Sequence, residues 1–239
     1  MFASLRTLYS FTVKDLLQLR RETNAFFTFG IALAATGTFI VISPGTKRDA
    51  TALQLLFLSP AIVVGNLFTR CIENEVRVFV LLRMMLRSAA SFLRLKFAVM
   101  AAVTIPILAA ITMIMSVVLR ASVRVSAVRF LVVSLAGLLE CAVCLGLAAL
   151  FTNLDQPMTS RNAGAPIWVH AGYWISAVPI ASLQWCLEWL WVGNLPLRHA
   201  SAAATSIAFT TAVWVLVLAI AGSSIFLLLV GCHRLARFD

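Results

Sequence analysis

The sequence predicts an all-α membrane protein with six transmembrane helices, and two observations support this fold class. First, 62% of the 239 residues are hydrophobic and only 12% are charged, with a mean hydropathy of +0.98. A soluble domain is about half apolar and about a quarter charged, so this excess does not fit one water-soluble core. Second, apolar residues gather in stretches near the roughly 20 residues that a helical span needs. These stretches are 25–44, 52–69, 97–119, 130–151, 164–180 and 203–231.

Residues 1–24 precede the first span and predict an amphipathic helix at the membrane interface. Leu5, Leu8, Leu16 and Leu19 fall near one helical face, and the cations fall mostly elsewhere. An ordinary helix packed on the protein's own loops remains an alternative. The first span is too long for the apolar region of a signal peptide, and 24 mixed residues precede it.

The second and fifth spans are short, and each contains a proline, Pro60 and Pro179 respectively. Proline kinks a span and leaves backbone groups for neighbouring helices or water to satisfy. The fourth span contains Cys141 and Cys144 in C-x-x-C spacing. Because this pair lies on an apolar helix, we interpret it as packing rather than as a metal or redox site.

The net charge of +10 would suit a nucleic-acid partner, but the cations flank the apolar stretches and are better read as topology signals. Six spans place both termini on one side, together with thirteen of the nineteen Lys and Arg residues. The positive-inside rule therefore predicts that both termini are cytoplasmic, in a cell (inner) membrane, with no nucleic-acid partner. The three cations in 120–129 are contrary evidence, because they lie on the side predicted to face away from the cytoplasm.

The connection 70–96 between the second and third spans combines cations with leucines. Arg83, Arg87 and Arg94 share one helical face, whereas most of the leucines lie on other faces. Such a helix is held at the membrane by its apolar side and offers its arginines to water, anionic lipid or a partner. Composition alone does not separate a partner-binding helix from a simple headgroup anchor.

The order of these features resembles the permease subunits of ABC-2-type transporters, a family that includes haem-exporter-like permeases. The similarity lies in the amphipathic helix before the spans and in "ENEVRVFVLLRMMLRSAASFLRLK", which runs from Glu73 and Glu75 to Lys96. It also lies in "LQWCLEWLWVGNLPLRH" within 182–200, which is similar to the outward-facing re-entrant helices of that family. The family's glycine after the acidic pair and its proline after the leucines are absent, and Leu195 separates Asn194 from Pro196.

The resemblance implies a transmembrane subunit of an exporter for a hydrophobic or amphipathic substrate. Segment 70–96 would be a cytoplasmic coupling helix that docks on a separate ATPase, and a second copy or a homologous permease would complete the transporter. The implied ATPase-coupling residues are Glu73, Glu75, Arg83, Arg87, Arg94 and Lys96. The sequence contains no G-x-x-x-x-G-K-[ST] phosphate loop, so we expect ATP and Mg²⁺ on the partner and no cofactor on this chain.

Five polar or aromatic residues within the spans are candidates for the substrate path: Asn66, Glu140, His170, Tyr173 and Trp174. An acid inside a span is costly and is a functional candidate by default. Glu140 could bind a proton or substrate, or it could be protonated and bonded to a neighbouring span. Asn66 could bond another helix, and His170, Tyr173 and Trp174 could form an interfacial aromatic belt.

In the predicted re-entrant segment, Glu188 and Asn194 are candidates for the exit, although Glu188 could also be a solvated acid beside a tryptophan anchor. The alternative function is a stand-alone channel or a membrane-embedded enzyme. An enzyme would need paired catalytic groups, and the sequence has no H-E-x-x-H or G-x-S-x-G motif. A channel gives no account of the cationic connection.

Overall fold

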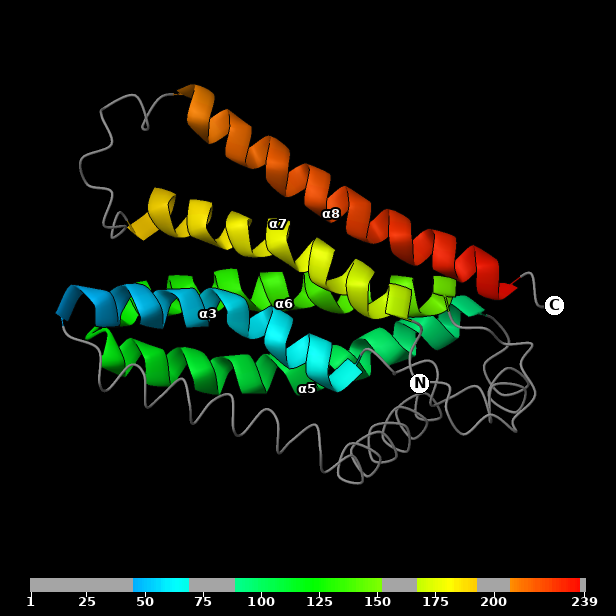
Figure 1. Ribbon diagram of the computed structural model, residues 1–239, viewed down its shortest axis with the longest axis horizontal. Helices are drawn as coiled ribbons and strands as arrows, with labels where there is room; N and C mark the ends of the chain where they lie inside the picture. The colour runs from blue at the N-terminus through cyan, green and yellow to red at the C-terminus, as the bar shows by residue number, and fades with distance from the viewer. Residues whose placement is uncertain (1–44, 69–88, 152–166, 193–206, 237–239) are drawn as a thin grey trace.

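The computed structural model describes residues 45–68, 89–151, 167–192 and 207–236, which form five α-helices and, within these ranges, no strand. The helices are α3 (Gly45–Phe68), α5 (Ala89–Val118), α6 (Val123–Phe151), α7 (Ile167–Val192) and α8 (Ile207–Ala236) (Figure 1). Of these, α3, α5, α6 and α8 contain windows long and apolar enough to cross a membrane. The described part of the chain is therefore that of an all-α membrane protein, as predicted.

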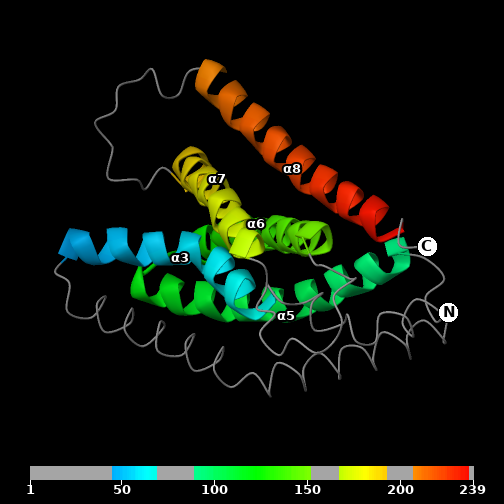
Figure 2. The same ribbon diagram turned by 45° about the vertical axis from the view of Figure 1, so that its right-hand side comes forward.

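Successive helices run in opposite directions, as Figures 1 and 2 show. We call the end of the bundle that holds the α5–α6 turn the turn end, and the other the connection end. The start of α3, the end of α7 and the start of α8 lie at the turn end (Figure 1). The helix ends that flank segments 69–88 and 152–166, and the last turn of α8, lie at the connection end (Figure 1).

Helix α6 is the centre of the bundle. Two thirds of its apolar window is buried (67%), against 17% for α8, and every residue from Glu140 to Ala149 is buried. A helix that is apolar all round packs inside a protein rather than at its edge. Large apolar side chains on α5, α7 and α8 are exposed, including Val117, Val178 and Phe226, and these faces suit acyl chains.

The α5–α6 turn is short and well defined by hydrogen bonds. The N–H of Ala121 donates to the carbonyl of Ser116 (2.9 Å), and the N–H of Arg120 donates to that of Val117 (3.1 Å). This pattern is the Schellman motif, which requires a left-handed residue after the helix. Arg120 takes that position with φ of 50°, although glycine is usual there. Ser122 caps α6, because its Oγ accepts the N–H of Val125 at 3.4 Å.

Two glycines let α6 and α8 approach closely near the connection end. A Cβ atom on Gly146 would lie 2.8 Å from the carbonyl carbon of Leu227, and one on Gly231 would lie 2.8 Å from the Cβ of Ala149. Small residues at a crossing let two membrane helices bring their backbones into van der Waals contact. The opposite end of α8 diverges from α7 (Figures 1 and 2).

Some predicted boundaries were wrong. The third predicted span, 97–119, begins earlier, because α5 starts at Ala89 and includes the end of segment 70–96. Helix α7 passes beyond 180 and ends at Val192, so residues 182–192 of the predicted re-entrant segment 182–200 continue the same helix. Helix α7 is also not among the four apolar helices. Segments 1–24 and 25–44, and the remaining parts of 70–96 and 182–200, lie outside the described residues.

Candidate functional site

Helix α3 bends partway along its length (Figure 1), and Pro60 lies inside it. Proline has no N–H to donate, and its ring conflicts with the carbonyl four residues earlier, which here belongs to Leu56. The hydroxyl of Ser59 donates to this carbonyl at 2.7 Å. The next carbonyl, that of Phe57, accepts a hydrogen bond from Gln184 Nε2 on α7 at 2.9 Å. The prediction that neighbouring groups satisfy the backbone at this proline is confirmed.

A second hydrogen bond joins α7 to the same part of α3. The hydroxyl of Tyr173 donates to the carbonyl of Ala61 at 2.9 Å, and the tyrosine is fully buried. Its ring lies against α3 at Gly65, where a Cβ atom would come within 2.7 Å of Tyr173 Cε1. The kinked segment of α3 is therefore held by two polar side chains of α7.

The same tyrosine also faces α6. The carboxyl of Glu140 lies close to the Tyr173 hydroxyl, and Cys141 and Cys144 lie nearby on α6. Glu140 is 1% exposed. We call Glu140, Tyr173, Cys141 and Cys144 the Tyr173 junction; it lies where α3, α6 and α7 meet. The structure thus brings Glu140 and Tyr173 together, as two groups of one buried polar site.

Glu140 is only partly satisfied at this junction, because its Oε2 has no hydrogen-bond partner. An unpaired carboxylate inside a membrane protein is costly, and a protonated carboxyl lowers that cost. Of its neighbours, Cys141 Sγ lies 3.6 Å from Thr104 Oγ1 on α5. Both cysteines are buried, and neither is part of a disulfide. No group of three or more potential metal ligands occurs among the described residues.

A buried ion pair lies at the turn end, away from the Tyr173 junction. Glu188 Oε1 on α7 accepts from Arg129 Nη2 at 2.6 Å and from Arg129 Nε at 2.9 Å. The two side chains are 1% and 3% exposed. The interpretation of Glu188 as a solvated acid was therefore wrong, because α7 continues past 180 and turns Glu188 toward α6.

The other path candidates do not join the junction. Asn66 Nδ2 donates to the carbonyl of Ile62 in its own helix at 2.8 Å, so it bonds no other helix through this group. Trp174 is exposed, with its ring edge-on to Tyr173 at 5.6 Å between centroids. His170 is half-buried one helical turn earlier. Trp185, one of the tryptophans near Glu188, packs edge-on against Phe57 with 5.1 Å between ring centroids.

Of the predicted ATPase-coupling residues, only the last two lie in the described part of the chain. Arg94 is exposed on α5, whereas Lys96 is 3% exposed. Lys96 is therefore not an exposed cation beside Arg94, and its role in coupling stays a prediction. Glu73, Glu75, Arg83 and Arg87, and the exit candidate Asn194, lie outside the described residues.

Gln184 and Arg129 are site residues that the sequence reasoning did not select. A signal for Gln184 was present, because Tyr173, Ala177, Ile180, Gln184 and Glu188 recur every three or four residues. All five are buried, so they form one face of α7. Dividing this face into a span and a re-entrant segment hid its periodicity. Arg129 had been counted only as a topology signal.

Comparison with known proteins finds no matching family model, no matching curated protein and no matching solved structure.

Proposed function

We propose that this chain is the transmembrane permease subunit of an ATP-binding-cassette exporter of the ABC-2 type, which moves a hydrophobic or amphipathic substrate. The observation that carries the proposal is the antiparallel order of the helices (Figure 1). This order brings the helix ends that flank 69–88, those that flank 152–166 and the end of α8 to the connection end. A partner that docks at this end has both connections within reach of one face.

The energy for transport comes from a separate ATPase subunit in this proposal. The sequence has no phosphate-binding loop with a lysine, so the partner binds ATP and Mg²⁺. Docking involves the cationic face of Arg83, Arg87 and Arg94. Closure of two ATPase subunits then rocks the membrane helices of two permease copies, or of two homologous permeases, between inward- and outward-open states.

The burial of Arg129 supports a cytoplasmic connection end. The positive-inside rule concerns cations in water-exposed loops, and Arg129 is buried and paired with Glu188. In the predicted six-span topology, leaving out Arg129 lowers the count on its side from six cations to five, and leaving out Lys96, which is also buried, lowers the count on the opposite side from thirteen to twelve. The difference favours cytoplasmic termini in a cell (inner) membrane and weakens the contrary signal in 120–129.

The substrate path in this proposal follows the helices corresponding to the second and fifth predicted spans, α3 and α7. These helices are joined by the hydrogen bonds of Tyr173 and Gln184 to the kinked segment of α3. They can therefore move together relative to α5 and α8. Trp174 and His170 lie at the surface of this pair, where a second permease copy would enclose them. Glu140 lies behind Tyr173 and positions it.

The test is to replace Arg83 and Arg87 together by glutamate and to measure transport-linked ATP hydrolysis of the assembled complex in lipid vesicles. Charge reversal on a docking face should abolish the hydrolysis while leaving the membrane subunit folded. The matched control is Arg124→Glu, which reverses an exposed cation at the turn end and should leave hydrolysis unchanged. Full hydrolysis by the double variant, or equal loss in the control, would reject the coupling role.

A further inference from the structure

A pocket of about 440 Å³ lies at the turn end, between the start of α3 and the α5–α6 turn. It is lined by Asp49, Leu53, Leu119, Arg120, Ala121, Ser122, Val125 and Arg129. Small-molecule sites commonly have volumes of about 300–1,000 Å³, with mostly apolar walls and a few polar groups. The pocket is of this size, and it combines four apolar side chains with three charged ones.

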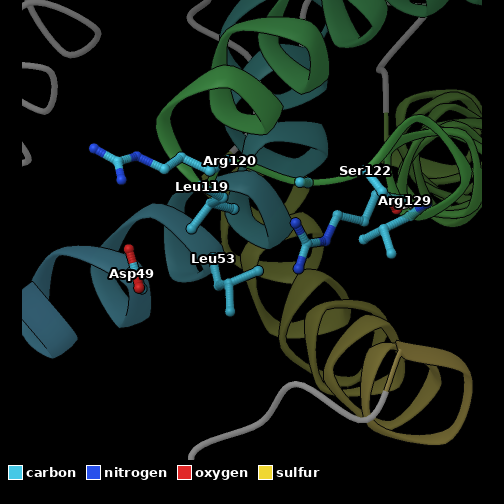
Figure 3. A pocket seen from close by; sticks show the side chains of 8 residues that line it. Asp49, Leu53, Leu119, Arg120, Ser122 and Arg129 are labelled. Atoms are coloured by element: carbon cyan, nitrogen blue, oxygen red, sulfur yellow. Dashed lines mark hydrogen bonds between the residues drawn. The ribbon is translucent and has the colours of Figure 1, made fainter.

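The charged groups of the pocket do not cancel one another directly. Figure 3 shows the guanidinium of Arg129 directed into the pocket, with Asp49 on the opposite wall and Arg120 extending to the Asp49 side. Arg129 is compensated by Glu188, which lies outside the lining. Asp49 and Arg120 are both exposed, and the structure contains no ion pair between either of them and another described residue. With respect to the described residues, the pocket therefore presents one unpaired charge of each sign.

Arg129 keeps donors that Glu188 does not use. Its two hydrogen bonds come from Nε and Nη2 and both end on one carboxylate oxygen, whereas a guanidinium has five N–H groups. Arginine forks of this kind bind phosphate oxygens well. Because Glu188 fixes the guanidinium, the remaining donors are held in place before any ligand arrives.

The surroundings of the pocket point to a lipid rather than to a soluble ligand. The pocket lies at one end of the bundle, in which four helices are long and apolar enough to cross a membrane. The ends of membrane-spanning helices lie at the depth of the phospholipid headgroups. Val117 and Val123, on either side of the α5–α6 turn, are 78% and 87% exposed. Such a surface suits acyl chains, and a lipid beside it can place its headgroup in the pocket.

We propose that this pocket binds the headgroup of a phospholipid that carries both a phosphate and a primary ammonium group, as phosphatidylethanolamine does. The phosphate accepts hydrogen bonds from Arg129, the ammonium donates to the carboxylate of Asp49 on the opposite wall, and the exposed guanidinium of Arg120 attracts the phosphate at longer range. A trimethylated headgroup has no N–H to donate to Asp49, so phosphatidylcholine binds more weakly. An anionic headgroup without an amine leaves Asp49 without a partner.

The experiment measures lipid binding to the purified full chain by native mass spectrometry, with phosphatidylethanolamine, phosphatidylcholine and phosphatidylglycerol of identical acyl chains in competition. Phosphatidylethanolamine should be retained about fivefold over phosphatidylcholine, the ratio that one charge-assisted hydrogen bond at a partly exposed site gives. Asp49→Asn should bring this ratio close to one. Arg120→Gln should weaken binding of all three lipids, and the control Arg124→Gln, which is exposed and outside the pocket, should leave binding unchanged.

Three results would overturn the proposal. A preference for phosphatidylethanolamine that persists in Asp49→Asn would show that Asp49 does not bind the ammonium group. Stronger retention of phosphatidylglycerol would show a site for anions only. Equal competition by water-soluble phosphoethanolamine would show a soluble ligand rather than a lipid. The thermal unfolding of Asp49→Asn is measured in parallel. An unchanged unfolding temperature shows that a loss of the preference for phosphatidylethanolamine reflects binding and not misfolding.

Discussion

The ion pair between Arg129 and Glu188 gives the sharpest test of how the turn end is held together. Replacing Glu188 by methionine leaves the Arg129 guanidinium buried without a counter-ion, and replacing Arg129 by methionine leaves the Glu188 carboxylate buried without one. The shortest contact is 2.6 Å, for which Coulomb's law at an effective dielectric constant of about 20 gives an attraction of about 6 kcal/mol. The loss of water around each buried ion costs several kcal/mol and offsets most of this attraction.

These two opposing terms predict a specific pattern. Each single variant should lower the free energy of unfolding by about 3–5 kcal/mol, because it keeps one desolvation cost and removes the attraction. The double variant, Arg129→Met with Glu188→Met, should lower it by about 1 kcal/mol or less, because both costs disappear together. The two substitutions should therefore be strongly non-additive.

The assay is unfolding in mixed micelles by titration with sodium dodecyl sulfate, followed by the fluorescence of the six tryptophans. Arg124→Gln is the control, since an exposed charge one turn before Arg129 should change the free energy by no more than about 0.5 kcal/mol. Additive losses in the double variant, or a loss below about 1 kcal/mol in both single variants, would refute this reasoning.

Three further substitutions test other parts of the structure. Gly146→Ala should lower the free energy of unfolding by about 1–3 kcal/mol, because the new Cβ meets the Leu227 backbone. The control Gly222→Ala should leave the free energy of unfolding unchanged, because nothing lies within 4 Å of that position. Equal losses for the two variants in the same titration would contradict the close crossing of α6 and α8. Tyr173→Phe should lower the free energy of unfolding by about 1 kcal/mol through the lost bond to the Ala61 carbonyl, and a stabilised variant would contradict that bond. Arg120→Gly should raise the free energy of unfolding by about 0.5–1 kcal/mol, because glycine adopts the left-handed backbone conformation of this position without strain. A lower sodium dodecyl sulfate concentration at the unfolding midpoint would contradict this.

Composition and proline placement predicted the class of the fold and one local feature correctly. The excess of apolar residues required membrane helices, and Pro60 required a neighbour to satisfy the freed carbonyls of α3. Both follow from local physics, since a proline disturbs the same carbonyls in any helix. The polar side chain that crosses from α7 to the carbonyl of Phe57 depends on tertiary packing, so the sequence alone did not identify Gln184.

The errors arose where a charged residue had a partner distant in the sequence. Glu188 and Arg129 are 59 residues apart, and nothing in the local pattern of either residue names the other. Glu188 was therefore assigned to solvent and Arg129 to a loop. Lys96 has the local pattern of a cation at the start of a span, but α5 begins at Ala89 and Lys96 is buried in it.

The central claim is that a separate ATPase drives this chain, and the most direct measurement is the composition of the particle that it forms. The chain should be purified through an affinity tag in a mild detergent, and the co-purifying proteins should be quantified by mass spectrometry. We expect one protein with a G-x-x-x-x-G-K-[ST] phosphate loop at equal stoichiometry, and its loss when Arg83 and Arg87 are replaced by glutamate. Recovery of the intact chain without any such ATPase would contradict the claim and favour a stand-alone channel or enzyme.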